Sequence, residues 1–301
     1  MPSYDAFGLV WALPFVCPEL GRPLPRSETA VDVTVNLGTE TPHLTGALDV
    51  EPFLQIKPDS ALFYFPKVAS YQIDCGKHIT IVPENNADEK RIRLFLLGTA
   101  AALLLHQRGI LPLHASGIRT PKGAVLFTGH SGSGKSTLLA TFLDRGYTML
   151  TDDLAAIALN PANQPVVFPG FPHLKLWADS AEQLNKPTNN LQRIQPDFDK
   201  YSVPLTTSLE HKPLQLNAVY ALTVSKTAKP HIEPLHAARK FNAFLDHTWQ
   251  KMALTRMNHH KDHFRQTAVI VKQIHMKRVF RPATPFLPHA LADLIEQDFM
   301  E

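Results

Sequence analysis

The chain of 301 residues is long enough for two domains or for one large one. Its formal charge of +3 is too small to indicate binding to nucleic acid or to a membrane surface. The two cysteines, Cys17 and Cys75, make neither a disulfide framework nor a zinc site and are typical of buried thiols in a reducing cytoplasm.

Residues 1–87 alternate short apolar runs with proline, glycine and Asn/Asp clusters, which predicts a small, mainly β domain. The expected strands are Val31–Leu37, Ala61–Phe65, Tyr71–Ile73 and Ile79–Val82. The stretch Phe7–Cys17 is also apolar, but Asp5 before it and Pro14 within it are unlike a signal peptide.

Asp88–Arg108 has helical character and joins this domain to the rest, so we expect domains at residues 1–108 and 109–301. Within the joining segment, Leu94–Leu105 is the most apolar stretch of the sequence. Because a bilayer-spanning helix needs about 18–20 apolar residues, this shorter run predicts a buried helix. We therefore expect no membrane partner and a cytoplasmic location.

The most informative motif is a glycine-rich segment between an expected strand and an expected helix. Residues 129–136 read Gly-His-Ser-Gly-Ser-Gly-Lys-Ser and match G-x-x-x-x-G-K-[ST]. The apolar run Ala124–Thr128 precedes this glycine loop, and Thr137–Asp144 follows it with helical spacing. In such a loop, backbone N–H groups point at phosphate oxygens, a lysine reaches the β- and γ-phosphates, and a serine hydroxyl ligates Mg²⁺.

The motif predicts a site for a nucleoside triphosphate, taken as ATP, with Mg²⁺. Its expected binding residues are Gly129, His130, Ser131, Gly132, Ser133, Gly134, Lys135, Ser136 and Thr137. Lys135 serves the phosphates and Ser136 the metal.

Two acidic residues follow the next expected strand. Tyr147–Leu150 leads into Thr151-Asp152-Asp153, and an apolar run, Leu154–Leu159, comes after them. A strand that ends in carboxylates, directly after a glycine loop, is where a metal-binding or catalytic carboxylate is expected. Neighbouring side chains at a strand end point in different directions, so Asp152 and Asp153 suit two roles better than one.

The remaining elements alternate between strands and helices. Strands are expected at Val166–Trp177 and Ala218–Val224, an edge strand at Val279–Pro282, and helices at Ala237–His260, His263–Val271 and His289–Asp298. Lys175, Arg193 and Lys200 are candidates for a phosphate clamp. The histidines at 259 and 263 have a spacing that could bind a metal, although an exposed helix end is the favoured interpretation.

Other nucleotide-binding classes lack their signatures here. The sequence has no Asn-Lys-x-Asp guanine reader, because Asn185-Lys186-Pro187-Thr188 lacks the aspartate. It has no Leu-Ser-Gly-Gly-Gln transporter signature and no His-Arg-Asp or Asp-Phe-Gly of protein kinases.

The order of the motifs resembles the C-terminal domain of HPr kinase/phosphorylase. His114, in Leu-Pro-Leu-His-Ala-Ser-Gly, precedes the glycine loop, and the Asp152-Asp153 pair follows it. The segment Gly146–Leu154 is similar to that family's Arg-Gly-His-x-Leu-x-x-Asp-Asp stretch, and Pro169–Trp177 is similar to a segment of HPr-kinase-related proteins. That group includes kinases of ribosomally made peptides such as lasso-peptide precursors.

The resemblance implies an α/β fold: a P-loop, phosphoenolpyruvate-carboxykinase-like kinase domain preceded by the small mainly-β domain. It also implies three catalytic residues. Asp152 would be the base that takes the proton of the acceptor hydroxyl, Asp153 would assist it or hold the metal with Ser136, and His114 would orient Asp152 or neutralise charge near it.

Two departures from the family bear on the substrate. His130 replaces an aspartate in the loop of true HPr kinases, and the family's Glu-x-Arg-Gly-x-Gly signature is missing. We therefore expect a kinase that acts on a serine-type hydroxyl of a peptide, protein or small molecule, leaves HPr alone and does not run the phosphorylase reaction. A free-amino-acid kinase and a nucleotide-binding regulatory module without phosphotransfer stay open as alternatives, as does a homo-oligomer.

Overall fold

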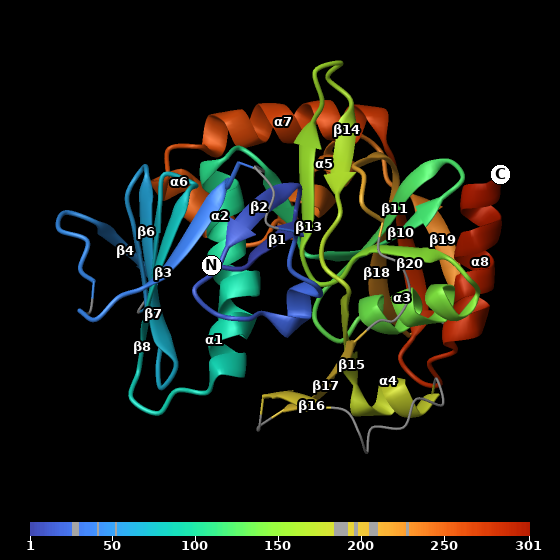
Figure 1. Cartoon of the computed structure of the whole chain (residues 1–301). Helices are drawn as coiled ribbons and strands as arrows, with labels where there is room; N and C mark the ends of the chain where they lie inside the picture. Colours follow the sequence, from blue (N-terminus) through green and yellow to red (C-terminus); the bar gives the residue numbers. More distant parts are fainter. Residues whose placement is uncertain are drawn as a thin grey trace. The chain divides into compact units, whose positions relative to one another are not determined.

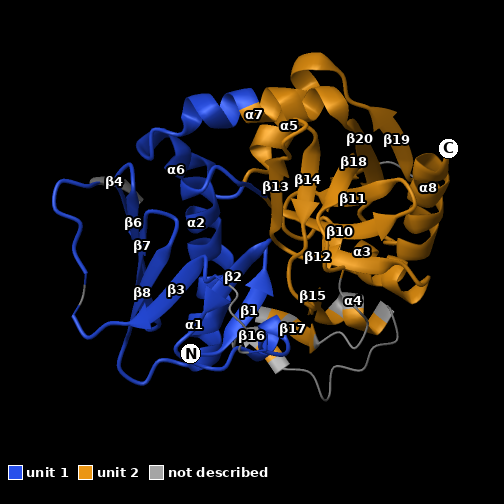
Figure 2. Ribbon diagram, turned by 45° about the horizontal axis from the view of Figure 1, so that its top comes forward, with its two compact units in different colours: residues 1–112, 249–265 blue, residues 113–248, 266–301 orange. Residues whose placement is uncertain are grey.

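The computed structural model describes residues 1–25, 30–40, 42–51, 53–183, 192–195, 198–204, 210–226 and 229–301. The chain forms a mixed α/β structure with three sheets. It divides into two compact units, Met1–Pro112 with Trp249–Arg265, and Leu113–Thr248 with Gln266–Glu301 (Figure 2). Among the described residues, every helix is too short or too polar to cross a bilayer.

Unit 1 is built on an eight-stranded sheet with the order β1-β2-β3-β8-β7-β6-β5-β4 (Figure 1). Its strands are β1 (Ser3–Ala6), β2 (Leu9–Ala12), β3 (Val33–Leu37), β4 (Leu48–Glu51), β5 (Leu54–Ile56), β6 (Ser60–Phe65), β7 (Ala69–Asp74) and β8 (His78–Pro83). Strand β3 pairs in parallel with β2 and β8, and the others pair antiparallel. β3, β6, β7 and β8 lie where the alternation of apolar residues places strands.

A helical segment covers this sheet and contains the most apolar stretch of the sequence. It consists of α1 (Glu89–Phe95), a π-helical turn η2 (Leu96–Ala100) and α2 (Ala101–Gln107), and Asp88 caps its start by accepting from the Lys90 N–H. The segment packs on β7, where the Tyr71 hydroxyl donates to the carbonyl of Ile92 at 2.9 Å. The short helices η1 (Pro18–Leu20) and α6 (Lys251–Arg256) complete unit 1.

Unit 2 contains a nine-stranded sheet in which β11 and β20 flank β18 in parallel. Its strands are β9 (Leu111–Leu113), β10 (Ala115–Thr120), β11 (Gly123–Thr128), β12 (Thr148–Thr151), β13 (Ala155–Leu159), β14 (Pro165–Phe168), β18 (Leu214–Ser225), β19 (His231–Pro234) and β20 (His275–Pro282). A three-stranded sheet is formed by β15 (His173–Trp177), β16 (Gln192–Gln195) and β17 (Phe198–Pro204).

The helices α3 (Lys135–Asp144) and α8 (Pro288–Met300) lie side by side against the large sheet (Figure 1). Their apolar residues share one core with β11, β18 and β20, in which Phe127 and Phe142 stack at 5.3 Å. The other helices are α4 (Ala178–Gln183), α5 (Ala237–Asp246) and α7 (His260–Gln273), the last of which runs from unit 1 into unit 2. This core holds the end of β11 and the start of α3 in place.

Three of the expected helices and strands differ from the structure, and Cys75, which the sequence analysis expects to be buried, is exposed. The helix expected over Ala237–His260 is broken at Gln250, whose φ of 51° does not occur in a right-handed helix. The single strand expected over Val166–Trp177 is two strands of different sheets, β14 and β15. Strand β20 is not an edge strand, because it pairs with β18 on one side and β19 on the other.

Candidate active site

The glycine loop connects the end of β11 to the start of α3. Its three glycines all have a positive φ, which favours glycine: φ is 143° at Gly129, 77° at Gly132 and 99° at Gly134. A Cβ on Gly129 would lie 2.6 Å from the carbonyl oxygen of Leu222, and one on Gly134 would lie 2.9 Å from the ring of Phe286. The helix starts at once, because the Leu138 N–H donates to the Gly134 carbonyl at 2.9 Å.

The lysine of the loop is folded back over it. Lys135 is 7% exposed, and its Nζ donates to the carbonyls of Gly129 at 2.8 Å and His130 at 3.2 Å. His130 itself is exposed, and its ring lies 5.5 Å from that of His247. The arrangement places a buried ammonium group inside the curve of a backbone loop, which suits an anionic ligand.

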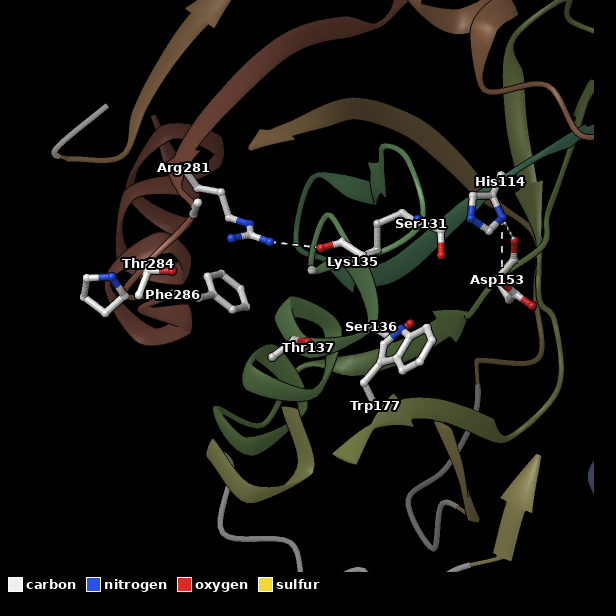
Figure 3. Close-up of a pocket in the computed structure, with 14 residues that line it drawn as sticks. His114, Ser131, Lys135, Ser136, Thr137, Asp153, Trp177, Arg281, Thr284 and Phe286 are labelled. Atoms are coloured by element: carbon white, nitrogen blue, oxygen red, sulfur yellow. Dashed lines mark hydrogen bonds and ion pairs between the residues drawn. The ribbon is translucent and has the colours of Figure 1, made fainter. Parts of the chain in front are cut away.

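The loop forms one wall of a pocket of about 630 Å³ that lies wholly within unit 2. The lining residues are His114, Ser131, Gly132, Gly134, Lys135, Ser136, Thr137, Asp153, Trp177, Arg281, Ala283, Thr284, Pro285 and Phe286. Figure 3 shows His114 and Asp153 at one end, Arg281, Thr284 and Phe286 at the other, and Lys135 between the two groups. The pocket therefore brings an expected catalytic carboxylate and the glycine loop into one space.

Asp152 lies behind this pocket, at the end of β12. It is 5% exposed and accepts three hydrogen bonds. Its Oδ1 accepts from the Ser116 hydroxyl at 2.7 Å and the Ser136 hydroxyl at 3.0 Å, and its Oδ2 accepts from the backbone N–H of Lys175 at 3.0 Å. The carboxylate is thus directed at the serine that follows the loop lysine.

Asp153 turns away from its neighbour and into the pocket. Its φ of 72° lies in the left-handed region, which few non-glycine residues adopt. The Lys175 Nζ donates to its Oδ2 at 2.7 Å, and Nδ1 of His114 lies 3.6 Å from its Oδ1 and 3.1 Å from its carbonyl oxygen. Strain of this kind persists where the surrounding structure over-determines a conformation, as it does at functional sites.

Of the three clamp candidates, Lys175 reaches the site. It is 8% exposed and contacts both aspartates, through its backbone N–H and its ammonium group. Arg193 is exposed and forms an ion pair with Asp199 at 2.7 Å in the three-stranded sheet. The side chain of Lys200 lies outside the described residues.

Two residues of the site, Ser116 and Arg281, are not among those that the sequence predicts. Ser116 stands two residues after His114 in the quoted Leu-Pro-Leu-His-Ala-Ser-Gly run, so that run contained the signal. Arg281 is 6% exposed, at the end of β20, and burial lowers the pKa of its guanidinium from the ordinary value. A single arginine that lies so far from the loop in the sequence belongs to no motif that would connect it with the loop.

The described residues include no cluster of three or more His, Cys, Asp or Glu side chains that could hold a metal ion. A magnesium ion does not require one, because it keeps several waters and is held by one or two protein oxygens together with substrate phosphates. The Ser136 hydroxyl and the Asp152 carboxylate, 3.0 Å apart, are oxygen ligands of the hard kind that magnesium prefers. The residues present therefore fit Mg²⁺.

Comparison with known proteins finds a likeness among solved structures. No protein-family model matches the chain, and no curated protein matches it. Among solved structures it is similar to the HPr(Ser) kinase/phosphatase from Coxiella burnetii, with 15% identity and a TM-score of 0.31 over 63% of this chain and 96% of that one. The likeness to HPr kinase that the motifs predict is thus found again among solved structures. At this TM-score the match says nothing of individual side chains, so the function must be argued from the site itself.

Proposed function

We propose that this protein is a magnesium-dependent kinase that transfers the γ-phosphoryl group of ATP to a serine-type hydroxyl, most simply on a peptide or protein. The observation that carries the proposal is the pocket of about 630 Å³ that both Lys135 and Asp153 line. A triphosphate bound along the glycine loop would have its terminal phosphate near the carboxylate of Asp153. An acceptor hydroxyl could then enter the pocket beside that phosphate.

The glycine loop and Lys135 would hold the β- and γ-phosphates. The ammonium group of Lys135 now bonds two loop carbonyls at 2.8 and 3.2 Å and is already inside the loop. Charge-assisted bonds from a buried ammonium to phosphate oxygens are stronger than neutral ones. Positioning and charge stabilisation supply most of the catalysis in phosphoryl transfer, because the protein has little covalent chemistry to perform.

Ser136 and Asp152 would hold Mg²⁺. When bound, the ion neutralises the charge of the β- and γ-phosphate oxygens. Asp152 is fixed for this task by its bonds from Ser116 and from the Lys175 N–H. The hydroxyl of Ser136 already points at the carboxylate, so both oxygens face the same small region next to the loop.

Asp153 would be the general base, so that we exchange the roles that the family resemblance implies for the two aspartates. Asp153 lines the pocket, whereas Asp152 is 5% exposed, accepts three hydrogen bonds and is not among the lining residues. In the transfer, the acceptor oxygen forms a bond to the γ-phosphorus, and the bond between the γ-phosphorus and the oxygen that bridges it to the β-phosphate breaks. The hydroxyl proton passes to the Asp153 carboxylate. ADP leaves with the bridging oxygen.

Lys175 and His114 would orient that base. Lys175 holds one carboxylate oxygen at 2.7 Å, and His114 lies against the other oxygen and the backbone carbonyl of the same residue. Together they restrain a side chain whose backbone is strained.

The test is incubation with ATP, Mg²⁺ and a panel of acceptors, read by mass spectrometry. The panel contains serine-bearing peptides, the same peptides with serine replaced by alanine, free serine, and HPr. We expect phosphate on serine-bearing peptides only. Phosphorylation of free serine alone would show a small-molecule kinase. Efficient phosphorylation of HPr would contradict the proposed acceptor. ATP hydrolysis without any phosphorylated acceptor would contradict the proposed kinase activity.

A further inference from the structure

Two buried cations, Lys135 and Arg281, bind four of the five backbone carbonyls of residues 129–133. Lys135 takes the carbonyls of Gly129 and His130, as described above. Arg281 takes the other two: its Nε donates to the Ser133 carbonyl at 2.8 Å and its Nη2 to the Gly132 carbonyl at 3.0 Å. The first half of the loop is thus held by the lysine of the motif, and the second half by a residue of β20.

Holding these carbonyls also orients the amides. In a planar trans peptide the C=O and the following N–H point in opposite directions. Because the Ser133 carbonyl faces Arg281, the N–H of Gly134 must point away from Arg281. Gly134 lines the pocket, so the guanidinium sets the direction of a donor of the kind that glycine loops present to phosphate.

The charge of Arg281 is not neutralised by a carboxylate in the described part of the chain. Its hydrogen bonds go to the carbonyls of Gly132, Ser133 and Pro282, and its guanidinium lies 4.1 Å from the centre of the Phe286 ring. Arg93 in unit 1 is the useful contrast: it is 8% exposed and bonds both carboxylate oxygens of Glu19, at 2.8 and 3.1 Å. A buried charge without a counter-ion is costly, and a bound anion would remove that cost.

We propose that Arg281 is a second cationic residue of the nucleotide site, a positioning residue that keeps the Gly132–Gly134 half of the loop in its phosphate-binding conformation and offsets the charge of the phosphate bound there. The proposal rests on the proposed function, since it takes the ligand to be a nucleotide. Phe286 supports the residue from one side, because its ring centre lies 4.1 Å from the guanidinium and its edge also lies against Gly134. The phosphate concerned would be the β-phosphate, which ATP and ADP share and which the backbone N–H groups of such a loop contact.

The experiment compares three variants by titration calorimetry with MgATP and MgADP, each checked for folding by thermal melting. Arg281→Met removes the charge and the fork of donors. Arg281→Lys keeps the charge but cannot match the planar fork. Arg278→Met is the matched control, because it removes the same charge from the same strand at a residue that does not line the pocket.

We expect Arg281→Met to weaken both nucleotides by about 10- to 100-fold, the range for a lost charge-assisted interaction. Arg281→Lys should recover part of that loss for both, and Arg278→Met should bind as the wild type does. A loss confined to ATP would contradict the proposal, since it would mean contact with the γ-phosphate alone.

Two further outcomes separate this proposal from the proposed function. If the wild type binds MgATP, Lys135→Ala abolishes binding and Arg281→Met binds normally, the role of Arg281 is wrong and the nucleotide site stands. If the wild type binds neither nucleotide, both are wrong. If Arg281→Met fails to fold, Arg281→Lys serves as the test. Wild-type affinity of Arg281→Lys for both nucleotides would overturn the proposal, because it would show that the paired donors of the guanidinium are not needed to hold the two loop carbonyls.

Discussion

The hydroxyl of Ser136 donates to Oδ1 of Asp152 over 3.0 Å and so ties the first turn of α3 to the end of β12. The next residue, Asp153, has a φ of 72° and faces the pocket instead. The two consecutive carboxylates therefore lie in different surroundings: Asp152 is buried behind the glycine loop, and Asp153 faces the pocket in front of it. The division of roles proposed above follows from this geometry.

Asp153→Asn should lower phosphotransfer by a factor of about 10²–10⁴, the usual contribution of a general base, with ATP affinity nearly unchanged. The amide keeps the size of the side chain but cannot accept the hydroxyl proton. Single-turnover transfer measures the effect, and Asp262→Asn, at an exposed position on α7, is the control. If Asp153→Asn stays within a few-fold of the wild type while Asp152→Asn loses activity, the base is Asp152, as the family resemblance implies.

Ser136→Ala should raise the Mg²⁺ concentration needed for half-maximal activity by about 10-fold or more, because it removes one of two oxygens assigned to the ion. A Mg²⁺ titration at saturating ATP measures this. Ser60→Ala is a matched control: Ser60 donates to Asp74 at 2.6 Å in unit 1, so the variant loses a similar Ser–Asp bond away from the site. An unchanged Mg²⁺ requirement in Ser136→Ala would remove Ser136 from the metal site.

Much of this site could be predicted because its signal is local. Glycines in the loop mark backbone conformations that other residues avoid. Gly129 is an example: its φ is 143°, and a Cβ on it would lie 2.6 Å from a backbone carbonyl oxygen. The flanking strand and helix could be recognised from Ala124–Thr128 and Thr137–Asp144, since each has the period of its element. The same holds for the alternating strands of the N-terminal part.

What could not be predicted depends on contacts between distant residues. The positive φ of Asp153 is a tertiary effect, so sequence alone could not say which aspartate would face the pocket. Arg281 meets the loop only because β18 lies between β11 and β20 and pairs in parallel with both, which brings the ends of β11 and β20 to the same edge of the sheet. The sequence predicts an exposed helix end at His263, but this residue is 7% exposed, and its ring lies 6.1 Å from that of the buried His106 in the same unit.

Gly129→Ala should destabilise unit 2 by roughly 1–3 kcal/mol more than Gly132→Ala does. Both glycines have positive φ, so both variants are strained, but only at Gly129 would the new Cβ meet backbone, whereas Gly132 has nothing within 4 Å. Urea unfolding of the two variants gives the comparison. Equal free energies of unfolding would mean that the loop does not hold the conformation described here.

Unit 1 should lose stability as the pH falls from about 6.5 to 5. Burial lowers the pKa of His106 to about 3 and that of His263 to about 4, from an ordinary 6.5, and His259 and His263 further disfavour charge on His106. In this window the unfolded chain takes up protons that the folded one does not, so the free energy of unfolding falls by up to about 1.4 kcal/mol per pH unit for each histidine. Above pH 6.5 the contribution is fully present.

The pH effect can be measured by urea unfolding in a Trp177→Phe background, where Trp11 and Trp249 of unit 1 are the remaining tryptophans. His263→Phe should reduce the slope, because it removes one of the two titrating groups. Carboxylates titrate mainly below this window. A free energy of unfolding that stays constant or rises as the pH falls from 6.5 to 5 would show that these histidines are not buried in the neutral form.

The glycine loop is proposed to bind the phosphates of ATP through Lys135, and the dissociation constant of MgATP for Lys135→Ala measures whether it does. Lys135 is buried inside the loop, and its two bonds to loop carbonyls contribute to the site rather than to the apolar core. Lys272→Ala, at an exposed position of α7, is the control. We expect tight MgATP binding by the wild type and the control, and a loss of affinity of at least about 100-fold in Lys135→Ala with its melting temperature nearly unchanged. Equal affinity of Lys135→Ala and the wild type for MgATP would contradict it.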